Sequence, residues 1–227
     1  MGNEEVTDSI LQVMKVTRRD VIDDFREAIS DVNTNGLPQA VWARRAKVLV
    51  KIFKHNDRIK VLHIKRGFWE INPVFNTETG ELYLLSSKDN FKNIKNKYLK
   101  NGTSTHYTYD LLIYNSGLLP LTSEVTLFPN NDDDEKRITE NQKMLGEWYE
   151  NVKKVYIVIV DYVVDEAIEA SCLLLNDQYA TVDEVNLTPL LHENDNDNKN
   201  LNGAMDNTDN KQHKPLVTLK KKQNKKE

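Results

Sequence analysis

Cysteine is almost absent from this chain. Cys172 is the one cysteine among 227 residues, which excludes a disulfide within the chain and any metal site built from several cysteines. It lies in an apolar run, residues 170–175, that supplies no cationic side chain to activate a thiol. We therefore expect Cys172 to be a small buried side chain.

Glycine and long apolar runs are also scarce. The eight glycines form no phosphate-binding loop of the Walker or dinucleotide type, so a nucleotide-binding function is not expected. No stretch approaches the roughly 18 apolar residues of a membrane-spanning helix, and the start of the chain lacks the apolar core of a signal peptide. Val6 stands where an N-myristoylation motif requires Ser or Thr. We expect a cytoplasmic protein with no membrane partner and no bound cofactor.

Charge is distributed unevenly along the chain, whose formal net charge is -4. Residues 193–227 are rich in Asn, Asp and Lys and have almost nothing to bury, so we predict a disordered tail there. The first 192 residues hold 23 basic and 29 acidic side chains, which argues against a nucleic-acid-binding face on the body. The end of the tail can still bind phosphates without sequence preference, through Lys220, Lys221, Lys222, Lys225 and Lys226.

The first 46 residues show the spacing of amphipathic helices. Apolar residues in 3–16 recur at helical intervals, and Thr17 with Asp20 resembles a capping box in front of a second helix that runs to Val32. Asn35 and Gly36 end that helix, and Pro38 opens a third.

From residue 47 the apolar period changes to that of strands. We predict four strands with short connections, forming an antiparallel meander in which Pro73 marks an edge or a bulge. A helix over 88–100 follows, and residues 103–117 favour a short helix capped by Thr103 or Ser104, with a strand as the alternative. The predicted strands cover residues 47–54, 59–65, 68–75 and 81–85.

The second half of the chain repeats the combination of helix and strands. An acidic loop, 129–137, precedes a helix, a strongly apolar strand over 155–164, and a second strand that pairs with it across a turn at Asp165 and Glu166. The sequence therefore predicts an α+β fold: N-terminal helices packed on an antiparallel meander, then a helix-plus-hairpin unit. One domain would cover residues 1–192, with sub-lobes at about 1–128 and 138–192.

Candidate catalytic residues are few. An enzyme acting on nucleic acid would need rigidly held carboxylates around metal ions, and Asp161 on the predicted strand is the best placed, with Asp165, Glu70 and His106 as companions. The five histidines show no metal-ligand spacing, so no metal site is expected. This enzyme is the alternative hypothesis, and nucleic-acid association through the tail is the third.

Aromatic and arginine side chains favour a different function. Such residues dominate the energetics of protein interfaces, and they occur in two short clusters. Neighbours on a strand point to opposite faces, so one of Phe68 and Trp69 can be exposed. We therefore expect a non-catalytic protein that binds a partner of unspecified identity or regulates it. The candidate binding residues are Trp42, Arg45, Arg66, Phe68 and Trp69.

Three segments, 67–91, 106–117 and 182–191, together resemble an uncharacterised family of domains of unknown function. The resemblance covers most of the first 192 residues. It implies an origin in low-GC Gram-positive bacteria and their phages or mobile elements, which agrees with the abundance of Asn, Lys and Ile. It implies no activity, and no residue role is carried over from it.

Overall fold

The computed structural model describes residues 3–67, 69–122 and 133–193. Phe68, residues 129–132 of the predicted acidic loop and all but the first residue of the predicted tail lie outside this part. The end of the predicted loop at residue 137 was wrong, because a helix already begins at Asp134. The fold is α+β, as the sequence predicts. No helix among the described residues is both long enough and apolar enough to cross a membrane.

A six-stranded mixed sheet forms the centre of the molecule, in the order β1-β4-β5-β6-β7-β8. Every neighbouring pair is antiparallel except β5 and β6, which run parallel. The parallel pair joins strands from the two predicted sub-lobes in one sheet. The strands are β1 (Ile59–Val61), β4 (Val74–Asn76), β5 (Glu81–Ser87), β6 (Lys154–Val163), β7 (Glu166–Leu175) and β8 (Thr181–Asn186).

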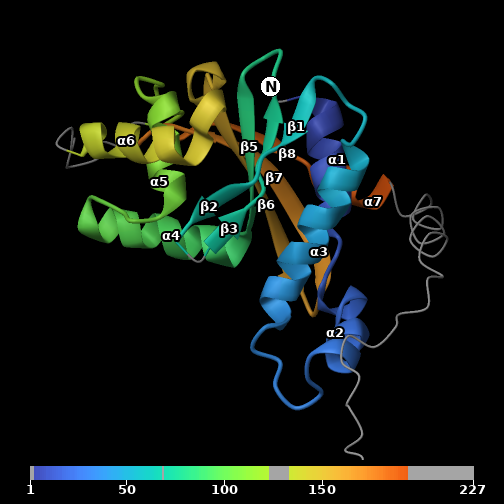
Figure 1. Cartoon of the computed structure of the whole chain (residues 1–227). Coiled ribbons are helices and arrows are strands. Elements are labelled where there is room, and N and C mark those ends of the chain that lie inside the picture. The colour runs from blue at the N-terminus through green and yellow to red at the C-terminus, as the bar shows by residue number, and fades with distance from the viewer. Residues whose placement is uncertain (1–2, 68, 123–132, 194–227) are drawn as a thin grey trace, which may run out of the picture. The chain divides into compact units, whose positions relative to one another are not determined.

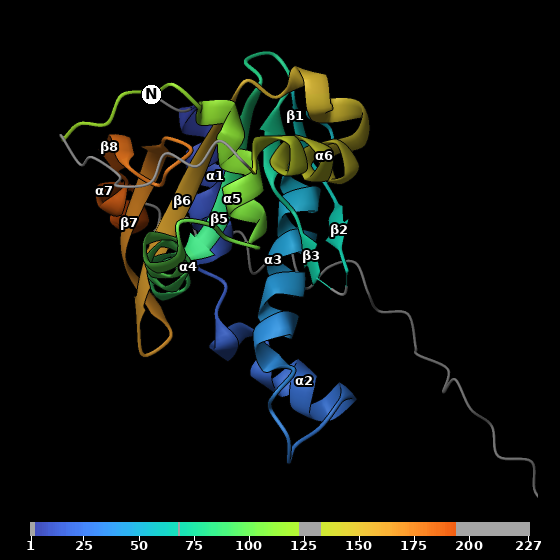
Figure 2. The ribbon, with the colours of Figure 1, turned by 90° about the vertical axis from the view of Figure 1, so that its left-hand side faces the viewer.

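Helices cover both faces of the sheet (Figures 1 and 2). Side chains alternate along β6, so that Val155 and Ile157 enter one apolar core while Tyr156 and Val158 enter the other. The first face carries α4 (Lys88–Asn101), α5 (Tyr107–Leu111) and α6 (Asp134–Leu145), and the second carries α1 (Glu4–Met14), α3 (Leu37–Ile52) and α7 (Thr188–Glu193).

The N-terminal helices are shorter than their apolar pattern suggests. The capping box of Thr17 and Asp20 is present, but it caps the 3-10 turn η1 (Arg18–Asp20). The following helix, α2 (Ile22–Ala28), ends early, and Ile29 and Val32 are 69% and 90% exposed. The extension of this helix to Val32 was therefore wrong, because Val21, Ile22 and Phe25 pack in an apolar cluster with α3, whereas Ile29 and Val32 are exposed.

The first strand of the predicted meander was also wrong, since residues 47–52 form the second half of α3. An apolar run of this length fits a helix as well as a strand. In the structure the run is helical, and the spacing of the buried residues agrees with a helix. Four residues of α3 at intervals of four are buried, namely Leu37, Val41, Arg45 and Leu49.

The next two predicted strands are each divided in two. Their outer parts, β1 and β4, pair in the large sheet, while β2 (Ile64–Arg66) and β3 (Trp69–Ile71) form a separate two-stranded hairpin. The break lies at Pro73, whose carbonyl accepts a hydrogen bond from Leu62 N–H. Proline cannot donate to a ladder, which explains why the pairing stops there.

Asn115 connects the first-face elements to the ends of two strands. It is buried at the end of the 3-10 turn η2 (Leu112–Asn115), and its Nδ2 donates to the carbonyls of Val155 (2.7 Å) and Leu175 (2.6 Å). Val155 N–H donates to its Oδ1 at 2.9 Å. One side chain thus completes backbone pairing that would otherwise be left buried and unsatisfied.

We predict that Asn115→Leu lowers the free energy of unfolding by about 3–5 kcal/mol, because it leaves one buried N–H and two buried carbonyls without these partners. Urea denaturation measures this loss. Asn96→Leu on the exposed side of α4 is the matched control and should change stability by no more than about 0.5 kcal/mol. Equal losses in the two variants would contradict the role given to Asn115.

Candidate functional site

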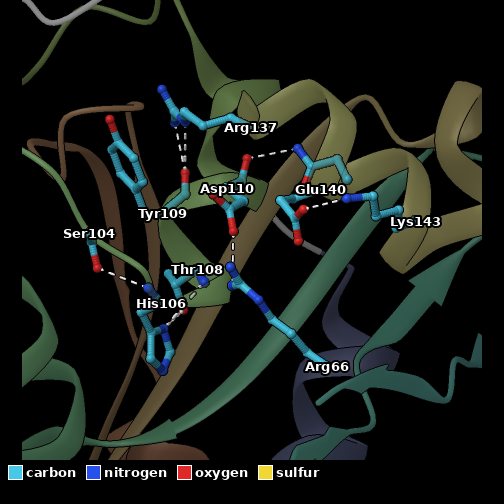
Figure 3. A network of polar contacts seen from close by, with 10 residues as sticks. Arg66, Ser104, His106, Thr108, Tyr109, Asp110, Arg137, Glu140 and Lys143 are labelled. Atoms are coloured by element: carbon cyan, nitrogen blue, oxygen red, sulfur yellow. Dashed lines mark hydrogen bonds and ion pairs between the residues drawn. The ribbon is translucent and has the colours of Figure 1, made fainter. Parts of the chain in front are cut away.

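His106 caps α5, in place of the Thr103 or Ser104 expected from the sequence (Figure 3). Its Nδ1 accepts the Thr108 N–H at 3.3 Å and lies 3.0 Å from Thr108 Oγ1, while Ser104 Oγ accepts the His106 N–H at 3.1 Å. In the neutral ring an accepting Nδ1 places the proton on Nε2. Burial lowers the pKa of His106 to about 4, with smaller contributions from the positive charges of Arg66 and Lys97.

Asp110, the residue before the last in α5, is buried and forms an ion pair with Arg66 (Figure 3). Its Oδ2 lies 2.9 Å from Arg66 Nη1, and Asn141 Nδ2 donates to its backbone carbonyl at 2.7 Å. Burial raises the pKa of Asp110, and the nearby guanidinium groups of Arg66 and Arg137 oppose that rise. The ion pair holds the end of the β2–β3 hairpin against the first-face helices, so the Arg66 predicted for partner binding has a partner within the chain.

Arg137 anchors α6 to α5 in the same network. It is buried, and its Nε and Nη2 donate to the Tyr109 carbonyl at 3.1 and 2.7 Å. Its guanidinium carbon lies 4.2 Å from the centre of the Tyr109 ring, and Nη1 lies 3.2 Å from Asp134 Oδ1. These contacts engage the hydrogen-bond donors of Arg137 within the chain. The network is therefore a structural element that holds the helices together.

The four candidate catalytic residues have separate sets of partners. Asp161 on β6 lies 2.8 Å from Lys88 Nζ, which is also 2.7 Å from Glu169. Glu70 on β3 pairs with Lys65 of β2 (3.3 Å) and with His63, just before β2 (3.6 Å). Asp165 lies in the β6–β7 turn with a positive φ of 65°, and His106 caps α5.

A metal centre is not formed by these groups. Among the described residues, no three His, Cys, Asp or Glu side chains are arranged to hold an ion. A cleft of about 430 Å³ lies between residues 60–64 and 143–148, and none of the four candidates lines it. Cys172 is buried, and burial raises its pKa to about 12, so its thiol stays protonated.

The outer side of α3 presents an apolar stripe to solvent. Trp42, Ala46 and Val50 follow one another at intervals of four residues, and Ala43 lies beside them. Trp42 is 40% exposed and Val50 is 51% exposed, although helix faces of this composition are usually covered. We call these four residues the α3 stripe.

The Trp42 side chain rests on a buried arginine. The guanidinium carbon of Arg45 lies 4.6 Å from the centre of the Trp42 ring and 5.4 Å from that of Tyr162 on β6. Arg45 Nε donates to the Val16 carbonyl at 3.0 Å, and Nη2 donates to the Met14 carbonyl (3.3 Å) and to Tyr162 Oη (3.0 Å). These hydrogen bonds fix the guanidinium in one orientation, and the Trp42 indole packs against it.

The other predicted binding residues lie on a different element. Trp69 is 58% exposed on β3, and Phe68 lies outside the described residues. Sequence reasoning selected Trp42 and Arg45. It missed the continuation of the stripe through Ala46 to Val50, because residues 47–54 were interpreted as a strand, and it missed Tyr162, because that residue is 117 positions from Arg45. The interval of four from Trp42 to Val50 was the available signal.

The fold and its surfaces define an α+β protein with a mixed sheet between two layers of helices. The chain belongs to a family of unknown function (DUF5986), whose model matches residues 2–227. The resemblance to an uncharacterised family is thereby confirmed, while the origin implied by it stays a prediction. No curated protein and no solved structure matches the chain.

The lowered pKa of His106 predicts a pH dependence of stability. Between pH about 4 and 6.5 the unfolded chain binds a proton on this imidazole that the folded chain does not, so stability should fall as pH falls through that window. In His106→Asn the amide oxygen can accept the Thr108 N–H and keep the cap. We expect the variant to lose less stability than the wild type between pH 7 and 4.5 in urea denaturation. Identical losses would show that His106 titrates normally.

Proposed function

We propose that the protein is a non-catalytic protein-binding or regulatory protein of the cytoplasm, and that it binds its partner through the α3 stripe. The observation that carries the proposal is the half-exposed Trp42 held against the buried Arg45. Tryptophan and arginine are the residues most enriched in the energetic centres of interfaces. An indole fixed before binding loses little conformational freedom when a partner covers it, which favours affinity.

The neighbours of Trp42 support the same proposal. The exposed Ala43 and partly exposed Ala46 are small enough for a partner backbone to approach closely, and Val50 extends the apolar stripe by two helical turns. A contiguous apolar stripe on a helix rimmed by polar residues is typical of interaction sites.

The two alternatives receive less support from the described residues. Asp161 is engaged by Lys88, and the carboxylates proposed for a nucleic-acid enzyme have different partners. The lysines of the tail lie outside the described part, so nucleic-acid association through them stays a prediction. The Asn- and Lys-rich composition supports, as part of the proposal, an origin in a low-GC Gram-positive bacterium, its phages or its mobile elements.

Affinity capture with the full-length chain tests the proposal. Nuclease-treated lysate of the source organism is passed over wild type, Trp42→Ala and Val50→Asp, and captured proteins are quantified by mass spectrometry. We expect a protein retained by the wild type to fall at least about tenfold with either variant, since interface centres contribute about 2 kcal/mol or more. Val50→Asp leaves the contact between Trp42 and Arg45 in place, so a loss there is not a folding effect of removing that contact.

Trp69→Ala is the matched control, because it removes a similarly exposed indole from another element. The proposal expects it to capture as the wild type does. A partner retained by both α3 variants, or lost only with Trp69→Ala, would contradict binding through the α3 stripe. Material that is captured from untreated lysate but not from nuclease-treated lysate would favour the nucleic-acid alternatives.

A further inference from the structure

The charge of α3 differs from that of the rest of the body. Its sixteen residues include Arg44, Arg45, Lys47 and Lys51 and no acidic side chain. The first 192 residues, by contrast, have six more acidic than basic groups. A helix that is basic within an acidic body produces a local positive potential, and such potentials select partners of opposite charge.

The basic side chains follow one border of the α3 stripe. At 100° per residue, Lys47 lies next to Ala43 on the helical projection, and Lys54 continues the same line just beyond the last turn. Both lysines are exposed. Arg44, one step further round, pairs with Asp24 of α2 at 3.3 Å, so that an acidic side chain already binds at this border within the chain.

The combination of an apolar stripe and a basic border discriminates between kinds of partner. A nucleic-acid backbone offers phosphates to Lys47 and Lys54, but it has no aliphatic surface to cover Val50 and Ala46. An amphipathic helix with acidic side chains beside its apolar positions satisfies both features. Small residues in the stripe also allow two helices to approach to the usual 8–10 Å.

We infer that the partner presents an acidic amphipathic helix, whose apolar side chains pack on the α3 stripe and whose carboxylates pair with Lys47 and Lys54. This inference rests on the proposed function and names the chemistry of the partner. Exposed ion pairs add little to affinity by themselves, so the apolar contacts hold the helix and the lysines choose its charge and orientation.

Two synthetic peptides test the inference. Both are 18-residue helices with leucines at helical intervals, one with Glu and the other with Lys at the flanking positions, and each carries a fluorophore for anisotropy. The full-length wild type should bind the Glu peptide at least about tenfold more tightly than the Lys peptide. The preference should weaken as salt rises, because exposed charges are screened.

The double variant Lys47→Glu/Lys54→Glu reverses the charge at the border of the α3 stripe. We expect it to lose the preference for the Glu peptide and to bind the Lys peptide better than the wild type does, a gain that misfolding would not produce. Trp42→Ala should weaken both peptides. No binding of the Glu peptide, or an unchanged preference in the double variant, would overturn the inference.

The outcomes separate this inference from the function on which it rests. If both peptides bind the wild type equally and both depend on Trp42, the acidic preference fails while binding through the α3 stripe stands. If a captured protein depends on Trp42 but not on the two lysines, the conclusion is the same. Two outcomes would assign the α3 stripe to another occupant. One is binding of anionic lipid vesicles, instead of the Glu peptide, that depends on Trp42. The other is a dimer in sedimentation that depends on Trp42.

Discussion

The buried guanidinium of Arg45 is the interaction on which the position of the candidate binding surface depends, because it joins α3 to the end of α1 and to β6. It lies against the rings of Trp42 and Tyr162 and donates to two carbonyls. One belongs to Met14, the last residue of α1, where a helix leaves carbonyls without intrahelical partners, and the other to Val16, two residues further on. One side chain of α3 thus joins α1 and β6. Burial lowers the pKa of Arg45, but Tyr162 and Asp20 favour its charged form. The arginine stays charged, and its position determines where the Trp42 ring lies.

A second buried arginine has the equivalent role on the opposite face of the sheet. Arg137 of α6 stacks on Tyr109 and donates twice to the Tyr109 carbonyl of α5. Neither arginine extends freely into solvent, so both serve to position helices. The two arginines differ in the rings that they contact. Tyr109, which contacts Arg137, belongs to the buried core, whereas Trp42, which contacts Arg45, is half-exposed. This difference is the physical basis for placing a binding surface on α3.

Local signals in the sequence were sufficient for much of this fold. The capping box at Thr17, the helix over 88–100 and the apolar strand at 155–164 each depend on residues close together in the chain, and the structure has all three. Contacts between residues far apart in the chain could not be predicted from the sequence. Tyr162 and Arg45 are 117 positions apart, and nothing in either segment indicates the other. The apolar run after Lys47 suits two kinds of element, and in the structure it continues α3 and buries Leu49 against the sheet.

Site-specific photo-crosslinking tests the central claim most directly. A benzophenone amino acid is placed at Ala43, inside the α3 stripe, or at Leu119, which is exposed on another part of the chain. The account predicts that illumination in cells of the source organism joins the Ala43 probe to one defined protein, and that the Leu119 probe gives no such product. Crosslinks of equal yield and identity from both positions, or none from Ala43, would contradict a partner-binding surface on α3.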